Sequence, residues 1–564
     1  MDEFPSFLFA FLTCFCKNYG TIDKVINYMK ITLQDISKTE EIKHTLHLSH
    51  LCAKVLSAKQ LDYSQISQIL SAPVLHDPMK ATHMPEVIAR IKQAKADHEK
   101  VLVCGDYDAD GICATTILFD ALCKYGITCG FYIPDRFKQG YGLHPDTVKM
   151  ADEKGYRLLI TVDNGVKAFD ALQEANKRHI DVIVTDHHDM EETEVKASLL
   201  LHPFTMGEEF QYLSGAGVAL EISRALLGDV KEHIVLAAVA SIADVMTLKN
   251  ETRDIVRLGI QYLKQGVCKP IQALANDRYP KWDETLIAFQ VVPKLNVMGR
   301  LADKVNVNNM VRYLLLQNAE EIQRVSKQIQ QLNEHRKKMS DEMVETAKSL
   351  IHPEYEFQML YHDSFHEGIV GLVAGKLSEE IKKPVMVLSR HEEMLKGSIR
   401  SQSYLDLTTF FDDCMDVLDS YGGHKAAAGI GFRIENKQDV QDYLNQKAKT
   451  SITPCEEEYE VIPLTIEEAS ILEVESLSKL APFGQGFEEP LFYLENVAVQ
   501  QIKPMGNGEH VKWVLNESVE AVLFHNKTAY DTFNERKTMN FIGTISINRF
   551  MGKKKVNIFV REAF

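Results

Sequence analysis

The chain has 564 residues, of which 45% are hydrophobic and 25% charged, and this composition excludes a low-complexity, collagen-like or short-repeat protein. The formal net charge of −16 argues against a protein that coats nucleic acid with a generally basic surface, although it leaves room for a local basic channel. Because single hydrophobic cores stop growing at about 250 to 300 residues, we expect three domains.

The cysteines and the N-terminal segment bear on the location of the protein. Ten cysteines occur without CxxC pairs, which is typical of free thiols in a reducing compartment and predicts a cytoplasmic protein. The apolar run FPSFLFAFLTCFC at residues 4–16 follows an acidic start and is too short for a bilayer, which needs about 20 apolar residues. We expect a buried or interfacial amphipathic helix there, within a helical extension of residues 1–50, and no membrane association.

From about residue 85 to 245, short β-branched runs alternate with helical patterns, as in a parallel sheet covered by helices. Strands are expected at 101–104, 130–133, 158–162 and 181–185, and acidic residues closely follow three of these four. In open α/β sheets, ligands bind beyond the carboxyl ends of the strands. The loops GDYDADG, TVDNG and TDHHD should therefore converge.

Acidic and imidazole side chains crowd these loops. They are Asp106, Asp108, Asp110, Asp163, Asp186, His187 and His188. Like charges at close range repel, so the crowding is costly unless a cation lies among them or water screens them. Asp244 closes the mostly apolar helical stretch IVLAAVASIADVM, where a lone buried carboxylate needs a partner, so it is a candidate to join the cluster.

The mixture of carboxylates and imidazoles favours Mn²⁺, whereas sites made of carboxylates alone favour Mg²⁺ or Ca²⁺. The side chains suffice for two ions. Two ions about 3.5 to 4 Å apart can activate water and stabilise both the attacking and the leaving oxygen at phosphorus. An aspartate after a strand also commonly caps a helix or occupies a turn, as Asp110 and Asp163 would. Each residue alone favours that simpler interpretation, but four clusters in order favour the metal site.

One apolar stripe predicts a long helix at residues 319–350. Its members recur at spacings of three, four or seven: Ile322, Val325, Ile329, Leu332, Met339, Met343 and Leu350. At 1.5 Å per residue the helix would be about 45 Å long, a length that usually bridges domains. The basic run HRKK at 335–338 is more typical of a solvated face than of a nucleic-acid contact.

Two further patterns follow the long helix. Residues 355–450 show a second α/β pattern, with strands in FQMLYHD and PVMVLS and a helix that HEGIVGL introduces. Residues 455–564 carry strand-like runs separated by turns, which predict a small β-barrel or sandwich. We expect Trp513 and the lysines at 553–555 to be exposed there, where they would stack on bases and attract phosphates, and most other aromatic residues to be core.

These motifs carry a family resemblance. GDYDADG, TVDNG, TDHHD and ADVMTL, in this order, resemble the four motifs of the DHH phosphoesterase superfamily, and KGSIRS and GGHKAAAG resemble its DHHA1 domain. PKLNVMGRLAD and LAPFGQGFEEPLF are similar, more narrowly, to the RecJ single-strand-specific exonucleases. The resemblance covers roughly residues 51–564. It implies an α/β protein with a parallel-sheet DHH domain at 51–315, a connecting helix at 316–352, a smaller α/β DHHA1 domain for substrate binding at 353–452 and an OB-like β-barrel at 453–564.

The resemblance also implies roles for single residues. Asp108 and Asp110 would bind metal, Asp163 would bridge two ions, and His187 and Asp244 would complete the second site. His188 would face the scissile phosphate, and Asp106 and Asp186 belong to the same catalytic loops. Many relatives carry histidine in place of Cys104; cysteine is a softer ligand than Mn²⁺ favours, so we expect Cys104 merely to end a strand.

For the substrate strand, the resemblance implies that Ser398, Arg400 and Arg300 hold a terminal phosphate, because a guanidinium binds phosphate in a bidentate way. Arg136 is a weaker candidate for the same pocket. A surface ion pair is the alternative role for Arg300 and for Arg400. His424 in GGHKAAAG would contact a phosphate or the leaving oxygen, beside glycines that let the backbone approach a ligand. A glycine-rich start of a helix is the alternative there.

The sequence thus predicts an exonuclease that uses two Mn²⁺ ions, with Mg²⁺ as a second choice, to hydrolyse single-stranded DNA. The resemblance alone implies the 5′-to-3′ direction and a role in DNA repair and recombination. We expect a monomer whose partners, besides DNA, are a single-strand-binding protein or a helicase. Two alternatives stay open: a DHH phosphodiesterase of oligonucleotides or cyclic dinucleotides, and a non-catalytic single-strand-binding replication factor.

Overall fold

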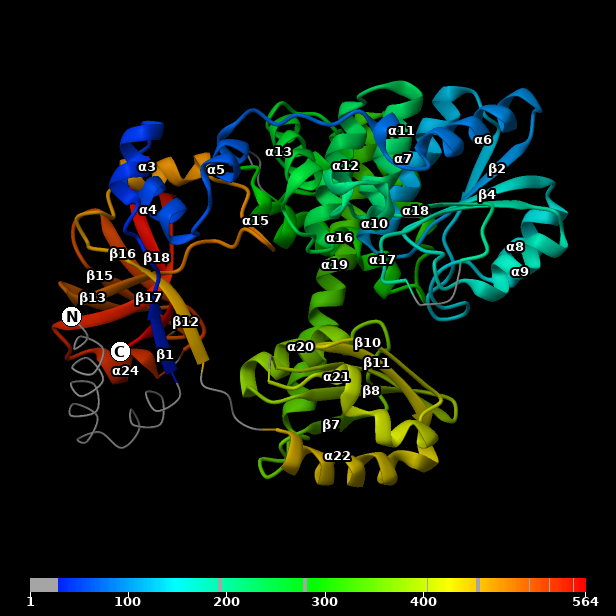
Figure 1. Cartoon of the computed structure of the whole chain (residues 1–564). Coiled ribbons are helices and arrows are strands. Elements are labelled where there is room, and N and C mark those ends of the chain that lie inside the picture. The colour runs from blue at the N-terminus through cyan, green and yellow to red at the C-terminus, as the bar shows by residue number, and fades with distance from the viewer. Residues whose placement is uncertain are drawn as a thin grey trace. The chain divides into compact units, whose positions relative to one another are not determined.

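The structure is a computed structural model that describes residues 29–190, 195–276, 281–402, 404–452, 457–506, 508–526, 528–550 and 552–564. These residues form two compact units (Figure 1). Of the described residues, those from 73 to 452 form one unit, and the other unit joins those from 29 to 72 to those from 457 to 564. The apolar run at 4–16 lies outside the described residues, so the helix expected there stays a prediction.

A five-stranded parallel sheet lies in the first unit, with the strand order β3-β2-β4-β5-β6. Its strands are β2 (Lys100–Cys104), β3 (Cys129–Tyr132), β4 (Tyr156–Val162), β5 (Asp181–Thr185) and β6 (Leu199–Leu201). The four expected strands are confirmed, and β6 is a fifth. From β2 the chain passes to one neighbour, β3, and then to the other, β4. The loop after β2 leads toward β3, whereas the loop after β4 leads the opposite way, toward β5, and loops that diverge in this way open a crevice for ligands.

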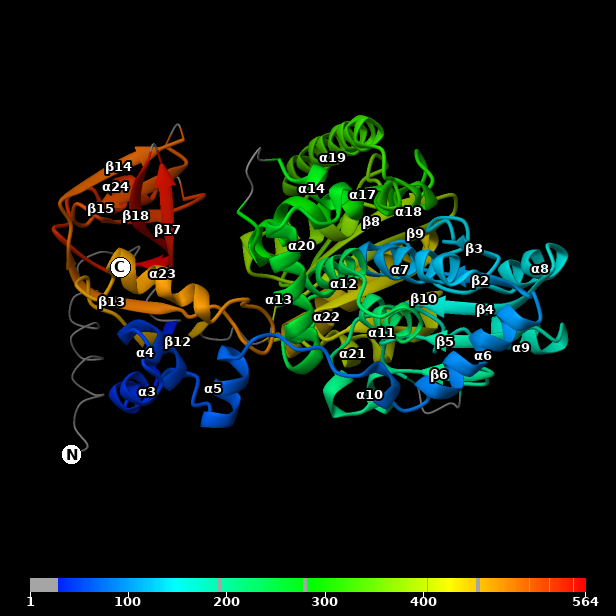
Figure 2. The ribbon, with the colours of Figure 1, turned by 90° about the horizontal axis from the view of Figure 1, so that it is seen from above.

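Helices cover both faces of this sheet (Figure 2). Val101 and Val103 of β2 pack into a core with α6 (Met84–Ala96), α7 (Ala109–Tyr125), α11 (Gly215–Leu227), α12 (Lys231–Ala243) and α13 (Asn250–Lys264). Leu102 and Cys104, which alternate with them, pack on the opposite face with α8 (Pro145–Glu153) and α9 (Phe169–Lys177). Burial on both faces explains why the strands are apolar throughout rather than alternating.

Shorter helices lead from the sheet to the connecting helix. They are α10 (Pro203–Met206), α14 (Lys269–Leu274), α15 (Glu284–Leu286), α16 (Val292–Leu295), α17 (Val297–Arg300) and α18 (Asn308–Leu314). The connecting helix α19 spans Ala319–Lys348 and confirms the helix expected at 319–350. It begins at the cap residue Asn318, whose side chain accepts a hydrogen bond from the backbone N–H of Glu321.

The second sheet of this unit has the order β10-β11-β9-β8-β7, and only β7 and β8 run parallel. Its strands are β7 (Gln358–Tyr361), β8 (Val385–His391), β9 (Met394–Arg400), β10 (Ser420–His424) and β11 (Ala427–Arg433), and its helices are α20 (Val370–Ile381), α21 (Leu407–Phe410) and α22 (Lys437–Ser451). GGHKAAAG forms the β10–β11 hairpin, so the alternative of a helix start is wrong. Gly422 pairs with Gly429 across the hairpin.

The second unit is an eight-stranded sheet with the order β1-β12-β13-β17-β18-β16-β15-β14. Its strands are β1 (Met29–Leu33), β12 (Glu457–Pro463), β13 (Phe492–Ala498), β14 (Gln501–Met505), β15 (His510–Val514), β16 (Val519–Leu523), β17 (Thr538–Phe550) and β18 (Lys553–Ala563). Its helices are α3 (Thr39–Leu46), α4 (His50–Ala58), α5 (Tyr63–Leu70), α23 (Ile471–Ser476) and α24 (Ala529–Phe533).

Residues 29–72 belong to this second unit, which differs from the helical extension and the start at residue 51 that we expected. β1 pairs in parallel with β12, some 430 positions away in the chain, and no local pattern in the sequence reports such a pairing. Helix α4 packs its apolar residues into the same core as the C-terminal strands. Lys54 reinforces this contact, with its Nζ atom 2.7 Å from an oxygen of Glu468.

Trp513 is fully buried, so the expectation of an exposed Trp513 is wrong. Along β15, Val511 and Trp513 point into the core, and the indole ring lies 5.3 Å from the ring of Phe541 and 6.2 Å from that of Phe533. A ring enclosed in this way is unavailable for stacking on a base. Of the three lysines, Lys553 and Lys554 are exposed as expected, and the Nζ atom of Lys554 lies 2.7 Å from an oxygen of Glu475. Lys555 is half-buried, with its Nζ atom 2.5 Å from an oxygen of Glu520, so the expectation is wrong for this residue.

The substitution Trp513→Ala is expected to destabilise the protein by about 3 to 5 kcal/mol, because it removes a large ring and leaves a cavity. Urea unfolding of the full chain measures this loss. Phe524→Ala is the matched control, since this ring is 45% exposed and its removal should cost about 1 kcal/mol or less. Equal losses in both variants would contradict the structural role of Trp513.

Among the described residues, no helix combines the length and the apolar character needed to cross a membrane.

Candidate metal centre

The loop after β2 turns directly into helix α7, and this turn places its three aspartates. Asp108 caps the helix, with its Oδ1 atom accepting a hydrogen bond of 3.0 Å from the backbone N–H of Gly111. The capping role anticipated for aspartates of this kind is therefore real for Asp108. Capping engages one of the two carboxylate oxygens and leaves the other available to a ligand. Asp106 and Asp110, on either side, are buried.

The acidic loops converge as the sheet topology predicts. Three groups of side chains offer ligand atoms that lie within 4.8 Å of one another: Asp106 with Asp108 and Asp163, Asp110 with His187 and Asp244, and Asp163 with His187 and His188. Asp163 and His187 each belong to two groups. The loops after β2, β4 and β5 and the end of α12 thus contribute to one centre.

Asp163 has a left-handed backbone conformation, with φ at 62°, which aspartate and asparagine tolerate better than most residues. The next residue, Asn164, anchors the turn by donating hydrogen bonds to the carbonyl oxygens of Cys104 and Val162. Gly215 packs against this turn so closely that a Cβ atom there would lie 2.5 Å from the Cβ atom of Asp163. The position of the Asp163 carboxylate is therefore fixed from both sides.

The N-terminus of helix α11 holds Asp110. The carboxylate accepts hydrogen bonds from Ser214 Oγ at 2.9 Å, from the Gly215 N–H at 2.7 Å and from the Ala216 N–H at 2.8 Å. Free N–H groups at a helix start stabilise a negative charge. Our sequence analysis missed this support, although the small residues of SGAG at 214–217 could have indicated a helix start that closely approaches an anion.

Several buried ligand atoms lack hydrogen-bond partners. His187 Nε2 lies 3.0 Å from Asp163 Oδ1, 3.6 Å from Asp110 Oδ2 and 3.5 Å from Asp244 Oδ2. Within the described part of the chain, neither His187 Nε2 nor Asp163 Oδ1 nor Asp106 Oδ1 forms a hydrogen bond. Each buried polar atom without a partner costs about 1 to 3 kcal/mol. A divalent cation among these atoms would remove that cost, so the residues fit a metal centre.

The charges of the centre lead to the same conclusion. Burial, and after it the neighbouring carboxylates, raises the pKa values of Asp106, Asp108 and Asp163 above the usual range and that of Asp244 to about 8. Burial also lowers the pKa of His187, which favours the neutral imidazole that binds metals. A cation supplies the positive charge that lets all these carboxylates ionise together.

Asp186 and Cys104 lie outside the three groups. Both oxygens of Asp186 are engaged: Oδ1 accepts from His188 Nδ1 at 2.8 Å and from two backbone N–H groups, and Oδ2 accepts from the Val166 N–H. These contacts place Asp186 to orient His188, and Asp186 contributes to none of the three groups of ligand atoms. Cys104 is buried at the end of β2 in the opposite apolar layer, and burial raises the pKa of its thiol to about 12, consistent with a residue that only ends a strand.

His188 is held from two sides. Burial is the largest influence and lowers its pKa, but the hydrogen bond to Asp186 and the charges of Asp186, Asp244 and Asp108 together raise the pKa to about 9, which favours the protonated imidazole at neutral pH. The hydroxyl of Tyr141 lies 3.0 Å from His188 Nδ1 and donates a hydrogen bond to the carbonyl oxygen of Asp163. Our sequence analysis missed Tyr141. Its only signal in the sequence is the pair of flanking glycines, Gly140 and Gly142, which have positive φ in the structure.

Asp186→Asn is expected to lower kcat about 100-fold while leaving Mn²⁺ binding intact, because it removes the carboxylate that charges and orients His188 but no ligand atom. Steady-state hydrolysis and a Mn²⁺ titration of the same sample separate the two effects. Asp170→Asn, at an exposed position at the start of α9, serves as the control. Loss of Mn²⁺ binding in the Asp186 variant would show that Asp186 is a ligand instead.

The candidate phosphate residues gather at the junction of the two sheets. On β9, the guanidinium of Arg400 donates a hydrogen bond of 2.6 Å to Ser398 Oγ. Gly371, at the start of α20, faces this pair: a Cβ atom there would lie 3.2 Å from Ser398 Oγ and 3.3 Å from Arg400 Nη2. Gly368 approaches the carbonyl oxygen of Arg300 so closely that a side chain would collide with it.

Arg300 has other cations as neighbours. Burial lowers its pKa to about 10, and the charges of Arg136, Arg336 and Arg400 contribute to the shift. In the described part of the chain, no carboxylate lies within 4.0 Å of the guanidinium of Arg300 or Arg400, so the alternative of surface ion pairs does not hold. Arg136 lies over the ring of Tyr107. His424 is exposed on β10, and its Nδ1 atom lies 3.9 Å from Asp189 Oδ2.

Three family descriptions match separate parts of the chain. Residues 100–258 match the N-terminal domain of the DHH family, residues 354–450 match the DHHA1 domain, and residues 462–562 match the RecJ OB domain. These matches follow the order of the parallel sheet, the mixed sheet and the C-terminal strands. The α/β architecture with its OB-type domain, expected from the sequence, is confirmed.

Similar proteins extend the match to nearly the whole chain. The single-stranded-DNA-specific exonuclease RecJ of Bacillus subtilis is 30% identical over 560 residues, which cover 95% of this chain and 70% of that protein. RecJ of Escherichia coli is 28% identical over 514 residues, covering 82% of this chain and 86% of its own. The structure of RecJ from Thermus thermophilus in complex with Mn²⁺ matches with a TM-score of 0.83 and 24% identity, over 95% of this chain and 80% of that one. This chain belongs to the RecJ family.

Proposed function

We propose that the chain is a metal-dependent exonuclease that hydrolyses phosphodiester bonds of single-stranded DNA in the 5′-to-3′ direction. The observation that carries the proposal is the convergence of Asp106, Asp108, Asp110, Asp163, His187 and Asp244 on one buried centre with unpartnered ligand atoms. Membership of the RecJ family supports the strand specificity and the direction. A guanidinium cluster beside the centre supports a polyanionic substrate.

Asp108, Asp110, Asp163, His187 and Asp244 would hold two Mn²⁺ or Mg²⁺ ions, with Asp106 as a further ligand. When bound, such ions activate water and stabilise the charge that develops on the oxygens around phosphorus. The chain's own contribution is to fix these side chains before substrate arrives: the α11 N-terminus holds Asp110, and the turn around Asn164 holds Asp163. Fixed dipoles and charges need no reorganisation during the reaction.

His188 has a role that its surroundings define. The Nδ1–H of His188 donates a hydrogen bond to Asp186, so the imidazolium keeps a second N–H, at Nε2, for an oxygen of the scissile phosphate or of the leaving group. Tyr141 packs edge-on against this ring, with 5.5 Å between the ring centroids. Together Asp186 and Tyr141 keep the positive charge of His188 beside the centre, where the phosphodiester would lie.

Arg136, Arg300, Ser398 and Arg400 would bind the terminal phosphate of the strand and so select its end, and His424 would contact a further phosphate. This division explains how the protein acts from an end rather than within a strand. We further propose a cytoplasmic monomer that acts in DNA repair and recombination, with a single-strand-binding protein or a helicase as its partner.

The proposal is tested by incubating the purified chain with Mn²⁺ and three substrates: a long single strand labelled at either end, its duplex and a dinucleotide. We expect mononucleotide release from the single strand, beginning at its 5′ end. Rapid cleavage of the dinucleotide with an intact long strand would instead indicate an oligonucleotide phosphodiesterase. Strand binding without cleavage would indicate a non-catalytic binding protein, and either result would overturn the proposal.

A further inference from the structure

Helix α19 buries one face along its whole length. Its buried positions include Ile322, Ser326, Ile329, Asn333, Ser340, Met343 and Ala347. They follow each other at spacings of four and three, except for a step of seven between Asn333 and Ser340. Arg336 occupies the position that completes the series. The repeat therefore places Arg336 on the buried face of the helix, among side chains that pack against the unit.

The basic run HRKK at 335–338 is therefore not one solvated face, as we had expected. Its other three members, His335, Lys337 and Lys338, are exposed, but Arg336 is half-buried. The polar residues Asn333 and Ser340 flank it on the same face, where an apolar residue would be typical. Asn333 accepts a hydrogen bond of 2.7 Å from Arg336 Nη2, which orients the guanidinium.

No described residue neutralises the charge of Arg336. Its Nε atom is buried and forms no hydrogen bond with any described residue, and no carboxylate among them lies within 4.0 Å of its guanidinium. A buried donor without a partner costs about 1 to 3 kcal/mol. Such a group on the packed face of a helix leaves a charge and a donor that an anionic ligand would satisfy.

Arg336 lies in the neighbourhood of Arg300. The turn that follows Arg300 packs on this stretch of α19: the Nζ atom of Lys304 lies 2.7 Å from His335 Nε2 and 3.9 Å from Met339 Sδ. Burial first, and then the charges of Arg136, Arg336 and Arg400, lower the pKa of Arg300 to about 10. Arginines from three other segments are thus close enough for their charges to act on Arg300, in a chain whose net charge is −16.

We infer that Arg336 is a fourth guanidinium of the strand-end site and binds the terminal phosphate of the DNA strand together with Arg136, Arg300 and Arg400. A phosphomonoester carries nearly two negative charges and three terminal oxygens, and it can therefore accept hydrogen bonds from several guanidiniums at once. The inference rests on the proposed function and deepens it. It makes the connecting helix part of the substrate site rather than only a spacer.

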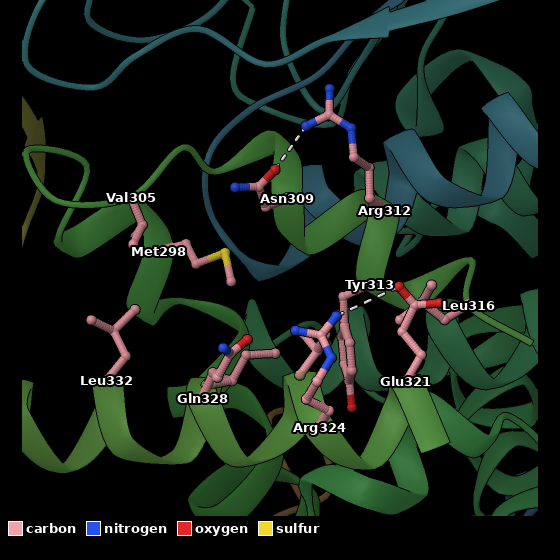
Figure 3. A pocket seen from close by; sticks show the side chains of 12 residues that line it. Met298, Val305, Asn309, Arg312, Tyr313, Leu316, Glu321, Arg324, Gln328 and Leu332 are labelled. Carbon is pink, nitrogen blue, oxygen red and sulfur yellow. Dashed lines mark hydrogen bonds and ion pairs between the residues drawn. The ribbon is translucent and has the colours of Figure 1, made fainter. Parts of the chain in front are cut away.

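Another arginine on the same helix provides a matched control. Arg324 is exposed and lies 3.7 Å from Glu321, and Figure 3 shows these two side chains joined beside a pocket of about 460 Å³ between α18 and α19. Its charge is already balanced within the protein. Arg324→Gln removes the same group from the same helix without touching the strand-end site.

The experiment compares one DNA sequence as a single strand with a 5′-phosphate and with a 5′-hydroxyl end. For the phosphorylated strand, Arg336→Gln should raise KM about 10- to 100-fold with little change in kcat, because one charge-assisted contact is lost. For the hydroxyl strand, KM should change less than about threefold. Arg336→Lys should restore part of the affinity, since it keeps the charge but not the bidentate geometry.

A second measurement does not depend on activity. In metal-free buffer, inorganic phosphate should raise the melting temperature of the wild type and of Arg324→Gln, and it should raise that of Arg336→Gln much less. Equal phosphate responses in all three proteins, or an equal KM increase for both strands, would overturn the inference. A wild-type protein that responds to phosphate through Arg336 but cleaves no DNA would overturn the proposed function and leave only the phosphate site at Arg336 standing.

Discussion

Replacing Asp163 by asparagine is expected to lower the rate of single-strand hydrolysis by about 10⁴-fold, a loss of roughly 5 kcal/mol of transition-state stabilisation. Asp163 belongs to two of the three ligand groups, so one substitution would remove a ligand shared by both proposed ion sites. Asparagine keeps the size of the side chain and tolerates the left-handed backbone at this position. The effect should therefore come from the lost charge alone.

Two comparisons show whether this interpretation holds. Asp170→Asn, seven positions along the chain and exposed, should keep wild-type activity. In metal-free buffer Asp163→Asn should be at least as stable as the wild type, because burial and neighbouring carboxylates raise the pKa of Asp163 and its charge thus opposes folding at neutral pH. A strongly destabilised variant would mean that its inactivity reflects misfolding rather than loss of metal.

Removal of divalent ions is expected to have an effect of the same size. After treatment with a chelator, hydrolysis should fall by about 10⁴-fold or more, because the remaining cations of the site do not activate water by themselves. Added Mn²⁺ should restore the activity and raise the melting temperature, since an ion at 100 times its Kd stabilises the folded state by about 2.7 kcal/mol. Activity that persists in the chelated protein would contradict a metal mechanism.

Much of the centre could be predicted because its signals are local. A run of buried β-branched residues predicts a strand, and the carboxyl ends of parallel strands share one edge, so Asp106 and Asp163 had to meet. The spacing of charged residues predicted the cation. The stripe from Ile322 to Leu350 likewise predicted α19, because a helix this long repeats its pattern many times.

The features that the sequence did not reveal depend on tertiary contacts. β1 joins a strand more than 400 positions away, and Trp513 and Phe524 occur in similar strand-like runs although one ring is buried and the other exposed. Tyr141 and the start of α11 reach the centre from segments outside the motifs GDYDADG, TVDNG and TDHHD. The basic run at 335–338 was expected to be exposed as a whole. Adjacent residues on a helix face different directions, however, and Arg336 alone lies on the buried face.

The central claim is that the clustered carboxylates and imidazoles hold two divalent ions. Anomalous scattering from a crystal of the wild-type protein soaked in Mn²⁺ tests it most directly. The account predicts two manganese peaks about 3.5 to 4 Å apart, both within coordinating distance of Asp163. No peak at this edge of the sheet, or peaks only at other acidic surfaces, would contradict it.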